Sequence, residues 1–261
     1  MDLSVIIVNY KSADKTLKCL SAIKSADLFG IEYEIIVVDN CSNDNGLEKI
    51  KSRHPEIITL ESKINLGMGA GNNAGVRLSK GEYILILNPD TYLGINSVKT
   101  LLSFMKAHRA VGLIGPRLNN HDGTLQYTCL RFPKIYTPLL RRTFLGRFMS
   151  AYLDNFLMKE FSHREAKEVD WIMGSCLFVR KKLFDEIGGF DSRFFMYFED
   201  TDLCRRIWQT GFKVMYVPQA EGVHDHGRAS ATRRWYVAPF TNALARAHII
   251  SWVKYFWKWG I

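Results

Sequence analysis

The sequence lacks the marks of several common protein classes. Its five cysteines are odd in number and scattered, and none belongs to a C-x-x-C pair, so we expect reduced thiols and no structural zinc site. The longest apolar runs, residues 4–8 and 83–87, are far shorter than the ~20 residues of a membrane-spanning helix. No basic stretch or cleavage site precedes the first run, which argues against a signal peptide. We therefore expect a globular protein of the cytoplasm.

Carboxylates are scarce toward the end of the chain. Residues 131–261 carry 21 basic and 13 acidic side chains, and no Asp or Glu follows Asp225. Residues 235–261 also hold four of the six tryptophans. Aromatic and basic faces of this kind lie on anionic membrane surfaces, although a packed helix with a basic outer face is an alternative. Nucleic acid is a less attractive partner, because no nucleic-acid-binding motif accompanies the charges.

Short β-branched runs alternate with helical spacing over the first ninety residues, which is typical of a mostly parallel sheet with helices on both faces. The expected strands are residues 3–9, 34–39, 57–60 and 83–87. In the later segments we expect a helix at 97–108, an amphipathic helix at 139–158, a helix that begins at 181 and another that ends near 210. The expected later strands are residues 111–115, 171–179 and 213–217. Polar residues that follow the strands would meet at the carboxyl edge of the sheet, where ligands bind in open α/β sheets.

Two of these polar segments suit a nucleotide. Asp39 precedes a run of turn formers, and its carboxylate can accept the imide N–H of uracil or thymine, with Asn9 and Tyr10 at the neighbouring strand tip. Capping of the next helix is the alternative for Asp39. Residues 65–75 contain four glycines and three asparagines, which suit a ribose or diphosphate. Asn72 breaks the G-x-G-x-x-G fingerprint, and a glycine-rich turn without a ligand is the alternative.

Two acidic segments compete for a divalent cation. Asp90 lies two residues after Asn88, beside the expected diphosphate site, and its oxygen atoms suit magnesium or manganese. The literal D-x-D of Asp200 and Asp202 would then act differently: Asp202 favours the start of its helix, and Glu199 or Asp200 points into the cleft as a general base. Alternatively, this cluster only caps the helix and pairs with the arginines that follow it.

Two late histidines, His224 and His226, flank Asp225. An imidazole at this place would complete the coordination shell of a metal at Asp90. A structural or solvated histidine pair is the alternative.

Taken in order, these segments resemble the inverting glycosyltransferases of family 2 with the GT-A fold, and within them the bacterial rhamnosyltransferase-like group of O-antigen and surface polysaccharide synthesis. The resemblance rests on VIIVNY, VVDNCSND, NLGMGAGNNAG, ILNPDT, DWIMGSCLFVR, GGFDSRFFMYFEDTDLCRR and HDHGRAS. It implies a Rossmann-like GT-A domain over residues 1–230, with a nucleotide-binding half (1–115) and an acceptor and catalytic half (116–230). Residues 231–261 would be a helical, basic, Trp-rich segment that associates with the membrane.

The resemblance implies roles for matching positions in three groups. The nucleotide group consists of Asn9, Tyr10, Asp39, Asn65 and Asn72. The metal group, for Mg²⁺ or Mn²⁺, consists of Asp90 and His224, with His226 as the alternative, and Asn88 stands where the family's D-x-D motif has its first aspartate. The group around the donor sugar and acceptor consists of Trp171, Gly174, the general base Asp200 and its neighbour Glu199.

The implied reaction is a single in-line displacement that inverts the anomeric configuration while Asp200 removes the proton of the acceptor hydroxyl. The favoured donor is dTDP-rhamnose, and the acceptor is a saccharide on polyprenyl diphosphate at the inner face of the cell membrane. A UDP-hexose or UDP-N-acetylhexosamine donor is an alternative, as is an inactive nucleotide-sugar-binding scaffold on the membrane. A sugar nucleotidyltransferase is disfavoured because residues 9–12 contain no glycine.

Overall fold

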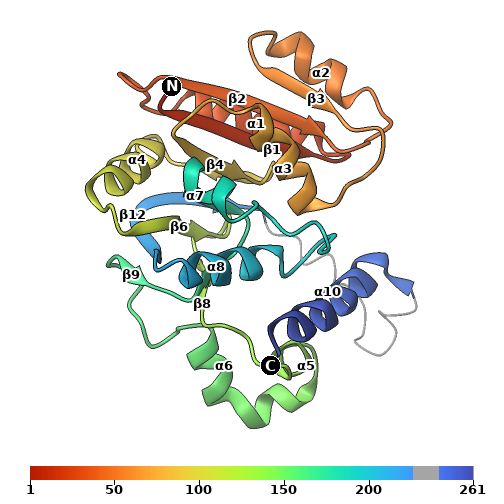
Figure 1. Ribbon diagram of the computed structural model, residues 1–261, viewed down its shortest axis with the longest axis vertical. Coiled ribbons are helices and arrows are strands. Elements are labelled where there is room, and N and C mark those ends of the chain that lie inside the picture. Colours follow the sequence, from red (N-terminus) through yellow and green to blue (C-terminus); the bar gives the residue numbers. More distant parts are fainter. Residues whose placement is uncertain (226–240, 261) are drawn as a thin grey trace.

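A mixed β-sheet runs through the protein in the order β3-β2-β1-β4-β11-β6-β12-β5 (Figure 1). This computed structural model describes residues 1–225 and 241–260. Its strands are β1 (Leu3–Asn9), β2 (Tyr33–Asp39), β3 (Ile58–Glu61), β4 (Tyr83–Leu87), β5 (Thr91–Leu93), β6 (Val111–Asn119), β11 (Cys176–Arg180) and β12 (Lys213–His224). The strands β3, β2, β1 and β4 are parallel, as are β6 and β12, whereas β11 and β5 pair antiparallel with their neighbours. The expected α/β fold with a mostly parallel central sheet is confirmed.

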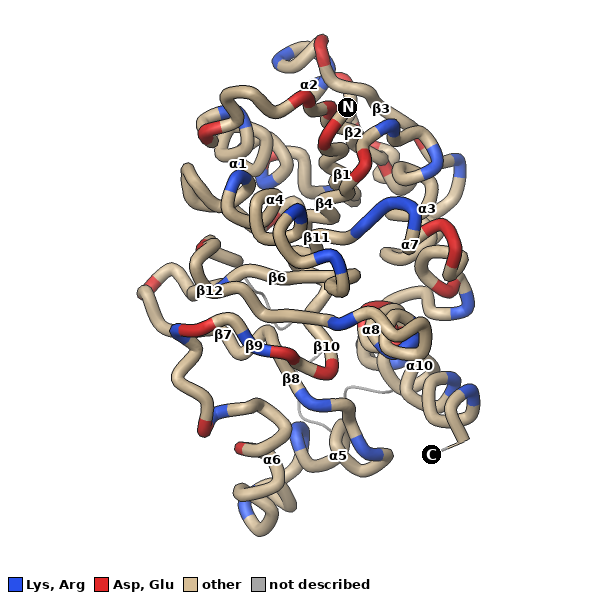
Figure 2. The backbone as a smooth tube through the Cα atoms, turned by 60° about the vertical axis from the view of Figure 1, so that its left-hand side comes forward, with Lys and Arg blue, Asp and Glu red and all other residues tan. Residues whose placement is uncertain are grey.

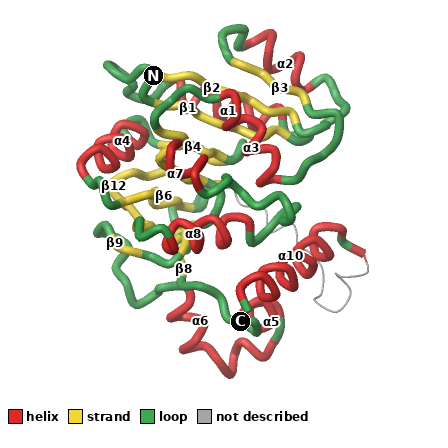
Figure 3. The backbone as a smooth tube through the Cα atoms, viewed as in Figure 1, coloured by secondary structure: helices red, strands yellow, loops and turns green. Residues whose placement is uncertain are grey.

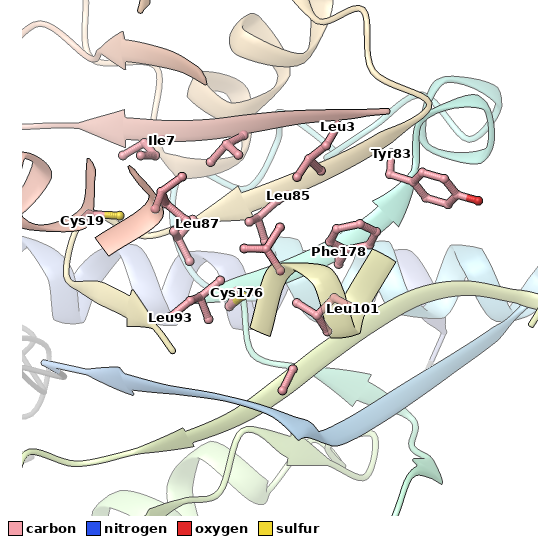
Figure 4. Packing of buried hydrophobic residues seen from close by; sticks show 14 of the residues in the cluster. Leu3, Ile7, Cys19, Tyr83, Leu85, Leu87, Leu93, Leu101, Cys176 and Phe178 are labelled. Atoms are coloured by element: carbon pink, nitrogen blue, oxygen red, sulfur yellow. The ribbon is translucent and has the colours of Figure 1, made fainter. Parts of the chain in front are cut away.

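Helices cover both faces of this sheet because successive residues of each buried strand point to opposite sides. Ile7 belongs to one core with Cys19 and Leu101, whereas Ile6 belongs to the other with Val76. Figure 4 shows the first core, with Ile7 and Leu87 beside Cys19. The helices of the first face are α1 (Ala13–Lys24), α2 (Gly46–Arg53) and α4 (Ser97–Ala107), and those of the second are α3 (Met68–Leu78), α7 (Lys181–Glu186) and α8 (Glu199–Gln209).

The glycine-rich segment 65–75 is mostly helix and not the glycine-rich turn that the sequence left open as an alternative. Helix α3 begins after Gly67, which has a φ of +81° and lies so close to Phe195 that a Cβ would be 2.2 Å from its carbonyl oxygen. A Cβ at Gly75 would be 2.6 Å from Ile6 Cγ2. The glycines therefore allow the helix to lie directly on β1, a packing role that their spacing did not distinguish from ligand binding.

Two expectations need correction. Residues 139–158 form three short elements, α5 (Thr137–Arg142), the 3₁₀ helix η1 (Phe144–Met149) and α6 (Ser150–Phe156). Thr143 interrupts the helix because its backbone is extended and its hydroxyl accepts the N–H of Leu145. The strand expected at 171–179 is divided into β10 (Trp171–Ile172), which pairs with β8 (Cys129–Leu130), and β11. Two short strands, β7 (Leu125–Gln126) and β9 (Lys167–Glu168), pair with β6 and β12.

The last helix, α10 (Ala243–Trp259), lies beside α8 and α5 and ends at Gly260, which has a φ of +63° (Figures 1 and 3). Tyr255 and Phe256 of this helix form a separate small core with Phe194 and Phe198. No helix within residues 1–225 and 241–260 is both long and apolar enough to cross a bilayer.

Candidate functional site

The residues expected to bind or react lie at the carboxyl ends of the strands and on the elements that follow them. Asn9 and Asp39 end β1 and β2, and His224 ends β12. Asp90 follows β4, and Asp200 lies in the first turn of α8. His226 lies outside the described residues.

Asp39 is the centre of a buried hydrogen-bond network. Its Oδ1 accepts hydrogen bonds from Asn9 Nδ2 (2.7 Å) and Ser42 Oγ (2.6 Å), and its Oδ2 accepts one from the main-chain N–H of Ser42 (2.9 Å). Asp39 therefore closes a local turn, whereas Asn45 is the N-cap residue of α2. Each carboxylate oxygen has two lone pairs, so Oδ2 keeps the capacity for a further donor. Tyr10 is 45% exposed beside this network, with a ring face that a planar base can contact.

Asn40 joins the end of β2 to the start of α3. Its amide nitrogen donates to Asn65 Oδ1 (3.0 Å) and to the carbonyl of Gly67 (3.1 Å), and its amide oxygen accepts the N–H of Leu66 (2.9 Å). Sequence reasoning missed Asn40 and Ser42, although both stand in the run of turn formers after Asp39. The run predicts a turn but does not tell which side chains hold it.

Asn72 lies inside α3 and is buried. Its amide nitrogen donates to the carbonyl of Met68 (3.0 Å), and its amide oxygen has no hydrogen-bond partner among the described residues. Asn88 at the end of β4 likewise has a buried amide oxygen without a partner in this part of the chain. Buried acceptors are costly when unpaired, so both atoms suit a donor group from a ligand.

Asp90 meets His224 across the sheet edge. Nε2 of His224 lies 3.4 Å from Oδ1 of Asp90, and Nδ1 of the same ring contacts Oε1 of Gln126 at 3.0 Å. Lys15 of α1, which sequence reasoning also missed, lies 3.6 Å from Asp90 and 3.0 Å from Asp225. Burial by itself would raise the pKa of Asp90, but His224 and Lys15 outweigh it and the pKa is lowered. Asp90 is therefore ionised at neutral pH.

This arrangement fits a divalent cation with few protein ligands. A carboxylate and an imidazole are both suitable donors, and His224 is held from behind by Gln126, as metal-binding histidines commonly are. Among the described residues no group of three or more His, Cys, Asp or Glu side chains is arranged to bind a metal. The other coordination positions would therefore need oxygen atoms from a ligand or from water.

Asp200 is held in place by main-chain N–H groups. Its Oδ2 accepts the N–H of Gly174 (2.7 Å), and its Oδ1 accepts the N–H of Thr201 (2.7 Å). Glu199 is buried next to it, and Oε2 of Glu199 has no hydrogen-bond partner in the described structure. The residue before them, Phe198, has a left-handed backbone with a φ of 66°, which turns the chain sharply into α8.

Both of these carboxyl groups have raised pKa values. Burial is the main cause for Glu199, and the neighbouring charge of Asp200 adds to it. Burial also raises the pKa of Asp200, although the N–H groups of Gly174 and Thr201 act in the opposite direction. A carboxylate with a raised pKa is a stronger base than one in water, which suits proton abstraction.

A main-chain hydrogen bond connects the surroundings of Asp200 to the segment that carries Asp90. The N–H of Asn88 donates to the carbonyl of Ser175 (3.0 Å), one residue after Gly174. Trp171, in contrast, uses its indole N–H on the carbonyl of Arg131 (2.8 Å) and is largely buried. The structure therefore brings Asn88, Gly174 and Asp200 together, whereas Trp171 belongs to the hydrophobic core of the second face.

Solved structures identify the fold. The chain aligns with S. aureus TarS residues 1–349 in complex with UDP (TM-score 0.59, 17% identity, 85% of this chain and 60% of that one). It also aligns with GalNAc-T7 in complex with UDP, GalNAc and Mn²⁺ (TM-score 0.65, 16% identity, 86% and 44%) and with the mannosyltransferase PcManGT of Pyrobaculum calidifontis in complex with GDP-Man and Mn²⁺ (0.61, 17%, 88% and 58%). The fold is thus the GT-A fold of glycosyltransferases, and the chain spans less than two thirds of each of these proteins.

The sequence comparison identifies the family. Residues 4–188 match Glycosyl transferase family 2, and residues 157–228 match the N-terminal domain of galactosyltransferase. The chain belongs to glycosyl transferase family 2. It is 28% identical over 241 residues to N-acetylglucosaminyl-diphospho-decaprenol L-rhamnosyltransferase of Mycobacterium tuberculosis, covering 87% of this chain and 77% of that protein. It is 29% identical over 260 residues to rhamnosyltransferase WbbL of Escherichia coli, covering 95% and 94%.

Proposed function

We propose that this glycosyltransferase transfers L-rhamnose from dTDP-rhamnose to a polyprenyl-diphosphate-linked saccharide, with N-acetylglucosamine as the first acceptor to test. The observation that carries the proposal is the position of Asp200, fixed by the N–H of Gly174 at the sheet edge that also holds Asp90 and His224. The names of the M. tuberculosis and E. coli relatives support rhamnose as the transferred sugar, and the M. tuberculosis name supports the acceptor class. The route belongs to surface polysaccharides of the O-antigen type.

In the proposed mechanism Asp200 takes the proton of the acceptor hydroxyl as the hydroxyl oxygen bonds to the anomeric carbon. The bond between that carbon and the diphosphate oxygen breaks, and attack from the opposite face inverts the configuration. Asp90 and His224 would hold a Mg²⁺ or Mn²⁺ ion, which when bound neutralises the charge of the leaving diphosphate. Asp39 and Tyr10 hold the nucleobase, and Asn72 and Asn88 offer their unpartnered oxygens to the donor.

The decisive experiment is an assay of purified protein with a panel of nucleotide sugars. Each donor is incubated with polyprenyl-diphosphate-linked N-acetylglucosamine and with Mg²⁺, Mn²⁺ or a chelator, and products are detected by mass spectrometry beside Asp200→Asn. We expect metal-dependent product with inverted configuration from dTDP-rhamnose only. Product from a UDP-hexose or UDP-N-acetylhexosamine alone would replace the donor. Tight donor binding without any product would favour an inactive nucleotide-sugar-binding scaffold.

We also propose that the protein lies on an anionic membrane surface at the inner face of the cell membrane. The segment from α5 to α6 carries exposed Phe144 and Phe148, the latter 80% exposed, and α10 carries Trp257, 81% exposed. Helix α10 is tied to the residues just before α5, because the indole N–H of Trp252 donates to the carbonyl of Ile135 (2.9 Å). Lys and Arg residues occur along both elements (Figure 2). Exposed aromatic rings beside cations suit a bilayer interface.

Vesicle sedimentation tests this surface. Phe148→Ser should reduce binding to vesicles that contain anionic lipid by about tenfold, because a large apolar side chain no longer enters the interface. Phe29→Ser is the matched control, since Phe29 is 90% exposed in the loop between α1 and β2. Equal binding of the two variants would refute this orientation.

A further inference from the structure

The inner face of α10 is organised around one buried carboxylate. Asp202, whose side chain is 0% exposed, accepts Lys258 Nζ (2.6 Å) and Trp259 Nε1 (3.0 Å) on Oδ1 and Arg206 Nε (2.8 Å) on Oδ2. Lys258 also lies 2.8 Å from Asp191. Asp202 lies in the first turn of α8, where its charge favours the start of the helix as expected from the sequence. Two of its three partners, however, come from α10.

Aromatic contacts extend this interface to Phe198, which lies two residues before the proposed base. The ring of Phe198 lies 5.2 Å from that of Tyr255 and 6.3 Å from that of Phe256. Arg205 of α8 lies over the ring of Trp259 at 4.7 Å and donates to the hydroxyl of Tyr255 (3.2 Å). The residue before α8 and the second turn of α8 are thus both packed against α10.

The loop before α8 is tied on two sides. On one side, Ser251 donates to the carbonyl of Met196 (2.8 Å). On the other side, the carbonyl of Phe195 accepts the N–H of Met68 at the start of α3 (2.8 Å). The loop cannot move without breaking contacts to α10 and to the segment proposed to bind the donor.

We propose that Asp202 and Lys258 are positioning residues, through which α10 sets the place of Asp200. The inference rests on the proposed role of Asp200 as the base. A buried carboxylate that loses a cationic partner is left poorly compensated, so α8 would shift toward water. Since Asp200 lies on the same helix two residues away, its carboxylate would move with it, and misplacement by about 1 Å can cost a reaction 10²-fold. The C-terminal segment is on this view part of the catalytic half and not a separable attachment.

The test compares Lys258→Met with Lys182→Met, a lysine on α7 whose side chain is 90% exposed. For Lys258→Met we expect kcat to fall at least about tenfold while the KM for the donor changes less than about threefold. In an Asp200→Asn background the same substitution should lower the residual activity no further, because the carboxylate it positions is gone. Additive losses in the double variant, or an unchanged kcat in Lys258→Met, would overturn the proposal.

A readout without turnover separates this idea from the proposed function. The N–H of Gly174 is bonded to Asp200, so its hydrogen exchange, followed by NMR, reports the position of that carboxylate. Exchange should accelerate at Gly174 in Lys258→Met while amides of β1 keep their wild-type protection. If no sugar is transferred by any form of the protein, the exchange result still decides the positioning. If Lys258→Met does not fold, the same two measurements are made on Trp259→Phe, which keeps an aromatic ring and both cationic partners of Asp202 but removes its indole N–H donor.

Discussion

The main-chain N–H of Gly174 and Oδ2 of Asp200 lie 2.7 Å apart. This hydrogen bond joins the loop between β10 and β11 to the first turn of α8, two segments 26 residues apart in the sequence. Because Oδ1 is held by the N–H of Thr201, the carboxylate has one fixed orientation. Fixed orientation is what a general base needs, since the proton it takes must lie within hydrogen-bond reach.

Asp200→Asn should therefore reduce kcat by about 10²–10⁴-fold, the usual contribution of a general base. The amide keeps the size of the side chain but offers only one acceptor oxygen to the N–H groups of Gly174 and Thr201, so we also expect it to cost about 1–3 kcal/mol of stability. Rates are measured at saturating donor and acceptor, beside Asp185→Asn on the surface of α7 as the control. A variant with more than half of the wild-type kcat would assign the base to another group.

The raised pKa values of Glu199 and Asp200 predict the pH dependence of the reaction. A base acts only when deprotonated, so kcat/KM should rise with pH and level off above the pKa of the pair. Burial and the interaction between the two carboxyl groups raise the pKa values of the pair, so the rise in kcat/KM should occur at a higher pH than for ordinary carboxyl groups. Glu199→Gln removes one of the two coupled carboxyl groups, so only Asp200 titrates and the rise in kcat/KM should move to lower pH.

The check is a pH–rate profile of both proteins at constant ionic strength. If kcat/KM of Glu199→Gln rises at the same pH as that of the wild type, or at a higher pH, the pair is not the titrating group.

Lys15 places a positive charge 3.6 Å from Asp90, where a metal ion is proposed to bind. The ammonium group of Lys15 repels a metal ion at Asp90, so its removal should strengthen metal binding. Lys15→Met should therefore lower the Mn²⁺ concentration for half-maximal activity by about tenfold. The control is Lys18→Met, on the exposed side of the same helix. Binding of Mn²⁺ in the presence of nucleotide, followed by electron paramagnetic resonance, should show the same difference.

The opposite result at Lys15 is also informative. If Lys15→Met needs more Mn²⁺ and binds the nucleotide less tightly, the ammonium group contacts the diphosphate and does not compete with the metal.

The N-terminal half of the fold was predictable because its signal is local. Short apolar β-branched runs such as residues 34–39 favour buried strands over helices, and the polar residue at the end of each run marks the carboxyl edge. Asn9, Asp39 and Asp90 follow from this rule alone. Glycines are ambiguous, as Gly75 shows, because the same residue permits contact with a ligand and with a neighbouring strand.

The partners of the site residues were less accessible because they come from distant parts of the chain. Nothing near Asp202 in the sequence indicates Lys258, and nothing near Asp90 indicates Lys15. Tertiary packing determines these two partners, whereas the pairing of Asp202 with Arg206, four residues later in the same helix, could be read from the sequence. The basic, Trp-rich end of the chain was interpreted as a membrane segment from composition, yet one side of α10 carries the partners of α8 and only the other is exposed.

His248 predicts an acid sensitivity of the contact between α10 and the loop before α8. Its ring packs against Tyr197 (5.0 Å) and Phe198 (5.5 Å), and burial, with the charges of Arg142 and Arg141, lowers its pKa to about 3. Between the unfolded-state pKa of about 6.5 and this value, the unfolded chain binds a proton that the folded chain does not. Stability should therefore be full above this window and fall as the pH decreases through it.

The measurement is urea unfolding at pH 7.5 and pH 5. His248→Gln should lose less stability between the two pH values than the wild type, whereas His121→Gln, with a side chain that is 65% exposed, should lose the same amount. If His248→Gln loses as much stability between pH 7.5 and pH 5 as the wild type, other groups cause the loss of stability in acid.

Substitutions at Tyr10 and Asp39 should both weaken nucleotide binding but should differ in their effect on stability. Tyr10 is exposed, so Tyr10→Ala should leave the free energy of unfolding within about 0.5 kcal/mol of the wild type. Loss of its stacking on a base, worth ~1–3 kcal/mol, should weaken dTDP binding by about five- to 150-fold. Asp39→Ala leaves Asn9 and Ser42 without their acceptor, so it should weaken binding and also cost about 1–3 kcal/mol of stability.

Calorimetric titration with dTDP and urea unfolding provide the two numbers for each variant, and Tyr10→Phe is the control that keeps the ring. Wild-type affinity in Tyr10→Ala would place the base elsewhere. Because Tyr10→Phe keeps the aromatic face and loses only the hydroxyl, a loss of affinity as large as that of Tyr10→Ala would mean that the hydroxyl binds the nucleotide through a hydrogen bond and that stacking contributes little.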